Sequence, residues 1–267
     1  WYLELVEKFA DIEKDPTVLQ GQMLQKASGI KNIYLTDENR EIWSKRLYNL
    51  SFRNLEKGQN DQFQISWFDL LLNCAETEKS IVDLREILDD KITFKNLTVD
   101  QEKRWDIITK LCAYNSTDSH DLINKEENND PGDLGKKRAF MARVAMPNID
   151  VKSEYWDMFV SSKQEHSSAF LRYGMEGFFW HKQKDMLEPY AAKYFTSLKN
   201  VFETKDVHYS SHYSSLLFPM TMNAEKTLNQ TERFINENKE LPKLCRKGLI
   251  ENADHLKRRI PILSTQK

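Results

Sequence analysis

Glycine and proline are scarce in this sequence, which has 8 glycines and 7 prolines among its 267 residues. These two residues supply most of the tight turns that an all-β fold needs between its short strands. Because so few of them are present, a turn-rich β fold is disfavoured. We expect instead long helices that are interrupted by few breaks.

Other missing features narrow the class of protein further. No apolar run approaches the roughly 20 residues that a membrane-spanning helix needs. The 39 basic and 41 acidic residues leave no basic excess for general contacts with nucleic-acid phosphates. We therefore expect a globular protein that has no membrane span and no nucleic acid as a partner.

The cysteines and the start of the chain give two more expectations. Cys74, Cys112 and Cys245 form no Cys-x-x-Cys pair, so neither a disulfide framework nor a structural zinc site is indicated. The sequence begins with Trp1, already inside a helical apolar pattern, and we interpret it as a fragment of a longer protein. Its Asn-x-Ser/Thr sequons leave the compartment of that protein open.

The patterns of known catalytic sites are absent as well. No histidine is followed by Glu-x-x-His, the helix signature of zinc proteases. His208 and His212 have the i, i+4 spacing of two metal ligands, but no carboxylate at a matching offset completes a site. Glu165, His166 and Ser167 are adjacent without the strained Gly-x-Ser-x-Gly turn of a hydrolase. We predict no catalytic residue, no metal site and no cofactor site in this chain.

The apolar residues have helical spacing, and the breaks between them, among them those near Thr36 and Thr77, leave room for about a dozen helices of roughly 10 to 20 residues. Trp67 and Cys74 return as Trp105 and Cys112, 38 residues later. This period lies near that of stacked helical hairpins. Two core helices that each carry Trp and Cys by coincidence explain this repeated spacing equally well. One apolar stripe near the C-terminus comprises Leu241, Leu244, Cys245, Leu249, Ala253, Leu256 and Ile260.

Three local predictions concern where helices begin and where the chain divides. Thr98 to Gln101 is typical of a capping box that starts the helix carrying Trp105. Pro189 suits the first turn of a helix. The polar segment 115–135 is the best internal boundary: we favour one long loop between stacked hairpins over a linker between two subdomains.

An aromatic cluster with one basic group is the most binding-like feature of the sequence. Arg172 precedes it, and Phe178, Phe179, Trp180 and His181 form it. Such residues line peptide-binding cavities because they offer apolar area and a charge for a carboxylate. Phe178 is better interpreted as core, whereas Trp180 and His181 suit core and cavity equally well. Arg172, Trp180 and His181 are therefore our candidate substrate-cavity residues.

One stretch is specific in residue order as well as in composition. That stretch includes Gly177-Phe178, the run from Met186 to Phe195 and Leu217-Phe218-Pro219, and it is accompanied by Arg104-Trp105, Ala145-Met146-Pro147 with Lys152 and Trp156, and Leu241-Pro242 with Arg246. In these segments the sequence resembles the C-terminal helical domain of zinc aminopeptidases related to aminopeptidase N and to the puromycin-sensitive and endoplasmic-reticulum aminopeptidases, and it is most similar to the bacterial branch.

The resemblance implies a fold and a function. Residues 1–267 would form a single all-α domain, an α-solenoid of HEAT- or armadillo-like hairpins. The zinc and its His-Glu-x-x-His helix would lie in an upstream catalytic domain of the same chain. This domain would cover that catalytic domain and line the cavity that receives a peptide substrate. The alternative is a free-standing helical-repeat scaffold that binds protein partners and has no enzymatic role.

Overall fold

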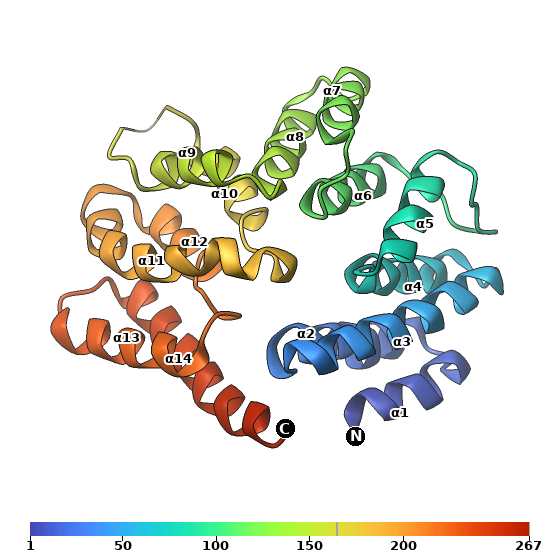
Figure 1. Cartoon of the computed structure of the whole chain (residues 1–267), viewed down its shortest axis with the longest axis horizontal. Helices are drawn as coiled ribbons and strands as arrows, with labels where there is room; N and C mark the ends of the chain where they lie inside the picture. The colour runs from blue at the N-terminus through green and yellow to red at the C-terminus, as the bar shows by residue number, and fades with distance from the viewer. Residues whose placement is uncertain (164, 267) are drawn as a thin grey trace. The chain divides into compact units, whose positions relative to one another are not determined.

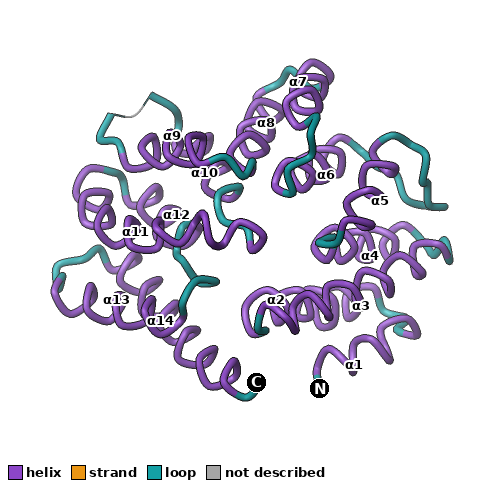
Figure 2. Tube along the Cα trace, in the orientation of Figure 1, coloured by secondary structure: helices purple, strands orange, loops and turns teal. Residues whose placement is uncertain are grey.

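The computed structural model describes residues 1–163 and 165–266, and every regular element among them is helical (Figure 2). The all-α prediction is confirmed. No helix in these two ranges is both long enough and apolar enough to cross a membrane. The α-helices are α1 (Tyr2–Phe9), α2 (Gln25–Tyr34), α3 (Asp37–Glu56), α4 (Asp61–Cys74), α5 (Glu78–Leu88), α6 (Gln101–Ala113), α7 (Ser119–Asn129), α8 (Asp133–Ala145), α9 (Ile149–Val160), α10 (Ser168–Glu176), α11 (Lys184–Thr204), α12 (Val207–Leu216), α13 (Ala224–Glu237) and α14 (Lys243–Ser264). Three shorter helical stretches are η1 (Ala10–Ile12), η2 (Val18–Leu24) and η3 (His181–Gln183).

Most helices begin where a small polar side chain precedes an apolar stripe. The Thr36 hydroxyl accepts a hydrogen bond from the Asn39 amide at the start of α3, and Thr77 forms a capping box with Ser80 at the start of α5. Such caps satisfy amide groups that have no partner inside the helix. The predicted breaks at Thr36 and Thr77 are therefore confirmed.

The prediction of a long loop over 115–135 is wrong, because α7 occupies residues 119 to 129 of that segment. Leu122 and Ile123 are buried, and the helix packs against α8. Two apolar residues in a polar background are enough to stabilise helix α7, because the neighbouring helix α8 supplies the rest of the buried surface. The segment is polar because the other faces of α7 are exposed.

Two predicted helix starts are also wrong. Asp100, not Thr98, caps α6: its carboxylate accepts a hydrogen bond from the Lys103 amide at 3.0 Å. Pro189 lies inside α11, which begins five residues earlier at Lys184. Burial of Leu187, which is fully covered, stabilises the turn before the proline and offsets the backbone hydrogen bond that proline cannot donate.

The chain divides into two compact units, and each has its own core. Unit 1 comprises residues 1–107 and 262–267, and unit 2 comprises residues 108–261. In unit 1, α3 and α4 form the most extensive helix pair, and the buried Trp67 and Trp105 lie in its core. The division falls within α6, before the segment 115–135 that the sequence suggested.

The helices of unit 2 pack in two layers (Figure 1). In one layer α10 packs against both α8 and α12, and in the other α11 packs against both α9 and α13. Contacts of α9 with α8 and of α11 with α12 join the layers. A solenoid with HEAT- or armadillo-like repeats stays a prediction.

Buried donors satisfy the last carbonyls of several helices, which have no partner inside their own helix. In unit 1, the Lys31 ammonium donates to Asn73 O at the end of α4, and the Gln64 amide donates to Leu55 O at the end of α3. In unit 2, the Tyr209 hydroxyl donates to Phe159 O at the end of α9, and the Tyr194 hydroxyl donates to Ser214 O near the end of α12. These bonds tie the end of one helix to the side of another.

Several of the residues that carry the family resemblance lie in the core of unit 2. Phe178, Leu187, Tyr194 and Leu217 are fully buried, and Tyr190 is almost so. They pack with aromatic residues of the neighbouring helices, including Trp156, Phe159 and Tyr213. The resemblance is therefore one of packing, and it predicts the fold more directly than it predicts a site.

Candidate functional site

The candidate site is built on the segment Gly177–Gln183, which joins α10 to α11 in unit 2. Phe178 anchors it. Its ring lies in the core, with ring centroids 5.1 Å from Tyr190 and 5.4 Å from Trp156. The interpretation of Phe178 as a core residue is confirmed, and the residues that follow it are held at the surface of a well-packed cluster.

Two buried polar side chains fix the backbone of this segment. The Lys152 side chain of α9 donates to Phe178 O and to Val144 O, each at 2.7 Å. The Gln183 amide donates to Ala113 O at 2.9 Å and to Ala145 O at 2.7 Å. Both ends of the segment are thus bonded to the ends of helices that are distant in sequence.

Gly177 allows the segment to approach α8. A Cβ atom at this position would lie 2.5 Å from Met141 O, which is too close for any side chain. The Gly177 amide donates to Tyr173 O and Gly174 O, so the turn that ends α10 is tight. The lack of space for a side chain therefore requires glycine at this position. The backbone angles (φ −84°, ψ −1°) would suit any residue.

We expect Gly177→Ala to lower the free energy of unfolding by about 1–3 kcal/mol, because the added methyl group must displace the Met141 backbone. Urea unfolding of the full chain measures this change. Gly248→Ala is the matched control: Gly248 lies within α14 with no atom near its added Cβ, so alanine there should stabilise by about 0.5–1 kcal/mol. If both substitutions changed the free energy of unfolding equally, Gly177 would not be closely packed against α8.

Trp180 and His181 are half-buried on this segment. The indole N–H of Trp180 donates to Gly177 O at 2.8 Å, which fixes the ring plane. The Lys110 ammonium lies 5.6 Å from the Trp180 ring centroid and 5.0 Å from that of Tyr114. A cation between two aromatic faces is stabilised by their quadrupoles. Part of the aromatic surface stays open to a ligand.

Arg172 lies on α10, with its side chain 40% exposed. It pairs with Glu176 one turn later, with an Nε–Oε1 distance of 3.5 Å. Its guanidinium lies 5.4 Å from the Tyr173 ring centroid, and that of Arg138 lies 5.7 Å from the same ring. This pair of arginines on one tyrosine provides positive charge beside an aromatic face.

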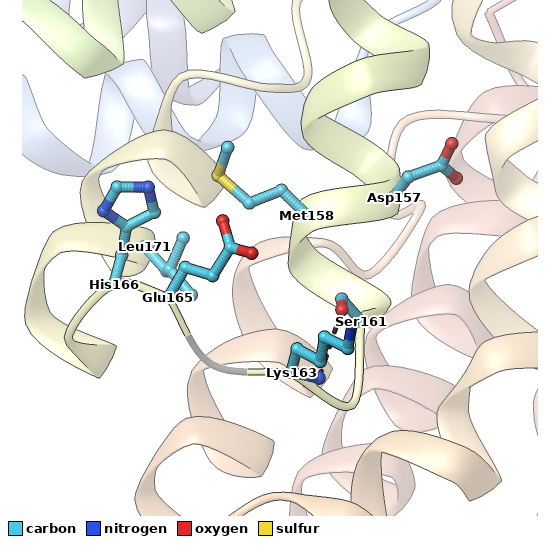
Figure 3. A pocket seen from close by; sticks show the side chains of 7 residues that line it. All are labelled: Asp157, Met158, Ser161, Lys163, Glu165, His166 and Leu171. Atoms are coloured by element: carbon cyan, nitrogen blue, oxygen red, sulfur yellow. Dashed lines mark hydrogen bonds between the residues drawn. The ribbon is translucent and has the colours of Figure 1, made fainter.

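Three surface pockets of unit 2 have none of the three predicted cavity residues in their walls. A pocket of about 240 Å³ lies between α9 and α10, where Met158 points toward Glu165 and His166 (Figure 3). A second, of about 390 Å³, lies beside Phe202 and Leu241, and a third, of about 330 Å³, lies beside His120 and Asn148. Whether Arg172, Trp180 and His181 line a substrate cavity stays a prediction.

The other sequence candidates have structural roles or lie at the surface. The Ser167 hydroxyl caps α10, and the His166 ring stacks on Phe170, with centroids 4.9 Å apart. His208 is exposed and His212 half-buried on α12. Within residues 1–163 and 165–266, no group of three His, Cys, Asp or Glu side chains is placed to hold a metal ion.

Comparison with known proteins places the chain in a family. The family model described as the ERAP1-like C-terminal domain matches residues 1–258. The chain belongs to this family. It is also 26% identical over 235 residues to the protein named aminopeptidase N of Streptomyces lividans, an alignment that covers 88% of this chain and 27% of that protein. The chain therefore spans about a quarter of the length of this curated relative, and the resemblance stated from the sequence is confirmed.

Several residues of the ERAP1-like domain's candidate site have no clear sequence signal. Lys110 and Tyr114 share the i, i+4 spacing of one helix face, but nothing in the sequence brings them to Trp180. Arg138 reaches Tyr173 only because α8 and α10 pack together. Lys152 belongs to one of the segments that carry the family resemblance, and only the fold shows that it is buried.

Proposed function

We propose that this domain is the C-terminal part of a zinc-dependent aminopeptidase, which removes N-terminal amino acids from peptides. The observation that carries the proposal is the match of residues 1–258 to the ERAP1-like C-terminal domain, together with the relation to aminopeptidase N. The catalytic domain of the same polypeptide would be its main partner.

The domain would cover that catalytic domain and contact the distal part of a peptide substrate. Trp180 and His181 offer half-buried aromatic surface, and Arg172 and Arg138 offer positive charge beside Tyr173. Aromatic area and guanidinium groups bind peptide side chains and carboxylates. The segment that carries Trp180 is fixed at both ends, so it would present a rigid surface to the peptide.

The residues described here do not fit the zinc ion of such an enzyme. A hydrolytic zinc site needs about three protein ligands with one position left for water. Among the described side chains no such group occurs, and His208 and His212 have no third ligand in reach. The metal and the residues that activate water would therefore belong to the part of the parent protein outside this chain.

We expect the complete protein to contain about one zinc ion per chain and to release amino acids from an aminoacyl substrate until a chelator removes the metal. The purified chain 1–267 should hold no stoichiometric zinc and should show no turnover. Metal analysis and a chromogenic assay measure both. Zinc and chelator-sensitive turnover in the isolated chain would contradict the proposal.

The coding sequence upstream of Trp1 provides an independent test. The proposal requires an upstream His-Glu-x-x-His motif followed by a second glutamate, because these are the residues that the chain itself lacks. A start codon next to the Trp1 codon, with no such motif, would instead favour a free-standing helical scaffold.

A further inference from the structure

Lys152 is a lysine with no exposed surface in the aromatic core of unit 2. Its nitrogen is hydrogen-bonded to two main-chain oxygens, Val144 O at the end of α8 and Phe178 O in the segment that leads to Trp180. It also lies 5.0 Å from the centroid of the Phe178 ring. No carboxylate is among these partners.

The number of acceptors matches an amine better than an ammonium group. A neutral amine has two N–H bonds, and both find a carbonyl here. An ammonium has three, so its third N–H would have only the face of the Phe178 ring, a weaker acceptor than a carbonyl, in a low-dielectric interior. Lys31 in unit 1 is equally buried but differs in its partners: its nitrogen lies 2.8 Å from the Glu76 carboxylate and 3.0 Å from Asn73 O. This charge-assisted pair with a carboxylate has no counterpart at Lys152.

We propose that Lys152 is an uncharged amine in the folded domain and that its protonation is a pH-sensitive switch on the anchoring of the segment Phe178–Gln183. In the neutral state the amine bonds α8 to this segment. In the charged state the third N–H and the buried charge weaken the cluster around Phe178. This inference concerns the folded chain and does not depend on the proposed function.

Charged and titratable groups of the elements around Lys152 have other partners. On α8, Arg143 pairs with Glu127, and on α10, Arg172 pairs with Glu176. On α11, Lys193 lies over the Tyr190 ring, at 4.6 Å from its centroid. Helix α9 also carries Glu154, Tyr155 and Asp157, and His181 lies on the anchored segment itself.

Burial lowers the pKa of Lys152 from 10.5 to about 7, and no neighbouring charge contributes to this shift. In the unfolded chain the pKa returns to its ordinary value near 10.4. Between these two pH values the unfolded chain binds one more proton than the folded chain. The stability that depends on Lys152 therefore rises with pH from about 7 to about 10 and is lowest at acid pH.

The direct test is NMR of the full chain with 13C-labelled lysine, in which the Cε signal of Lys152 is the one missing from Lys152→Met. We expect this signal to titrate with a midpoint near neutral pH. A midpoint above pH 9.5 would overturn the proposal. The titration is measured on the wild-type protein, so the test remains valid even if Lys152→Met is unstable. In that case Lys152→Arg, which keeps a permanent charge, identifies the Lys152 signal instead.

A second experiment measures the effect on stability. The unfolding equilibrium constant of the wild type, divided by that of Lys152→Met, should fall about tenfold per pH unit between pH 8 and 9.5. Lys193→Met removes an exposed lysine near the same cluster and should leave the wild-type profile unchanged. A ratio that is constant over this range would overturn the proposal.

Hydrogen exchange gives the local readout. After correction for the intrinsic pH dependence of exchange, the amides of 178–183 should open at least threefold more often at pH 6 than at pH 8.5, relative to those of α3 and α4 in unit 1. Equal opening of the two regions at both pH values would show that Lys152 does not control the segment.

Discussion

Phe178→Ala is expected to lower the free energy of unfolding by about 3–5 kcal/mol, the usual cost of removing a buried phenylalanine ring. Phe178 is fully buried, and its ring contacts Trp156, Phe159, Phe179 and Tyr190. The cavity would open in the centre of unit 2, where the surrounding aromatic side chains are too rigid to fill it. The substitution would also remove the contact between the Lys152 nitrogen and the Phe178 ring.

Trp180→Ala is the matched control, because Trp180 lies two residues along the same segment but is half-buried. It loses one hydrogen bond, to Gly177 O, and part of its apolar contact. We expect a cost of about 1 kcal/mol. Chemical unfolding of both variants, followed by circular dichroism, gives the two values. Similar costs for both variants would contradict the assignment of Phe178 to the core and Trp180 to the surface.

Much of the fold follows from the sequence because the signals are physical and local. Scarce glycine and proline, caps such as Thr36 and Thr77, and stripes such as that of α14 predict helices and their starts. Residues of the family resemblance, such as Phe178 and Tyr194, are core residues, and core packing constrains residue order strongly. This is why the resemblance, carried by segments from Arg104 to Arg246, is visible although no catalytic motif is present.

The parts that sequence did not predict depend on neighbours that only the fold supplies. Helix α7 forms in a polar segment because α8 covers Leu122 and Ile123. Pro189 lies inside α11 because Leu187 is buried before it. The same holds for the site: Lys152 looks like any lysine on a helix until α8 and the segment after α10 enclose it.

Arg172→Ala and Trp180→Ala are each expected to lower kcat/KM about five- to tenfold for peptides of roughly nine residues in the complete protein. The reason is the loss of about 1–1.4 kcal/mol of contact with the distal part of the peptide. A single-residue chromogenic substrate would contact only the catalytic domain, so its kcat/KM should stay within about twofold. The quantity to compare among variants is the long-to-short ratio, which is kcat/KM for the long peptide divided by kcat/KM for the single-residue substrate.

The control variants come from a similar pair in unit 1. The Arg46 guanidinium lies 3.9 Å from the centroid of the Trp43 ring on α3, so Trp43→Ala and Arg46→Ala remove the same residue types from another surface. These variants should leave the ratio unchanged.

This ratio is the most direct test of the central claim, that the surface around Trp180 and Arg172 contacts the peptide. The account predicts a fall in the long-to-short ratio for the Arg172 and Trp180 variants alone. An unchanged ratio in those two variants, with folding intact, would contradict it.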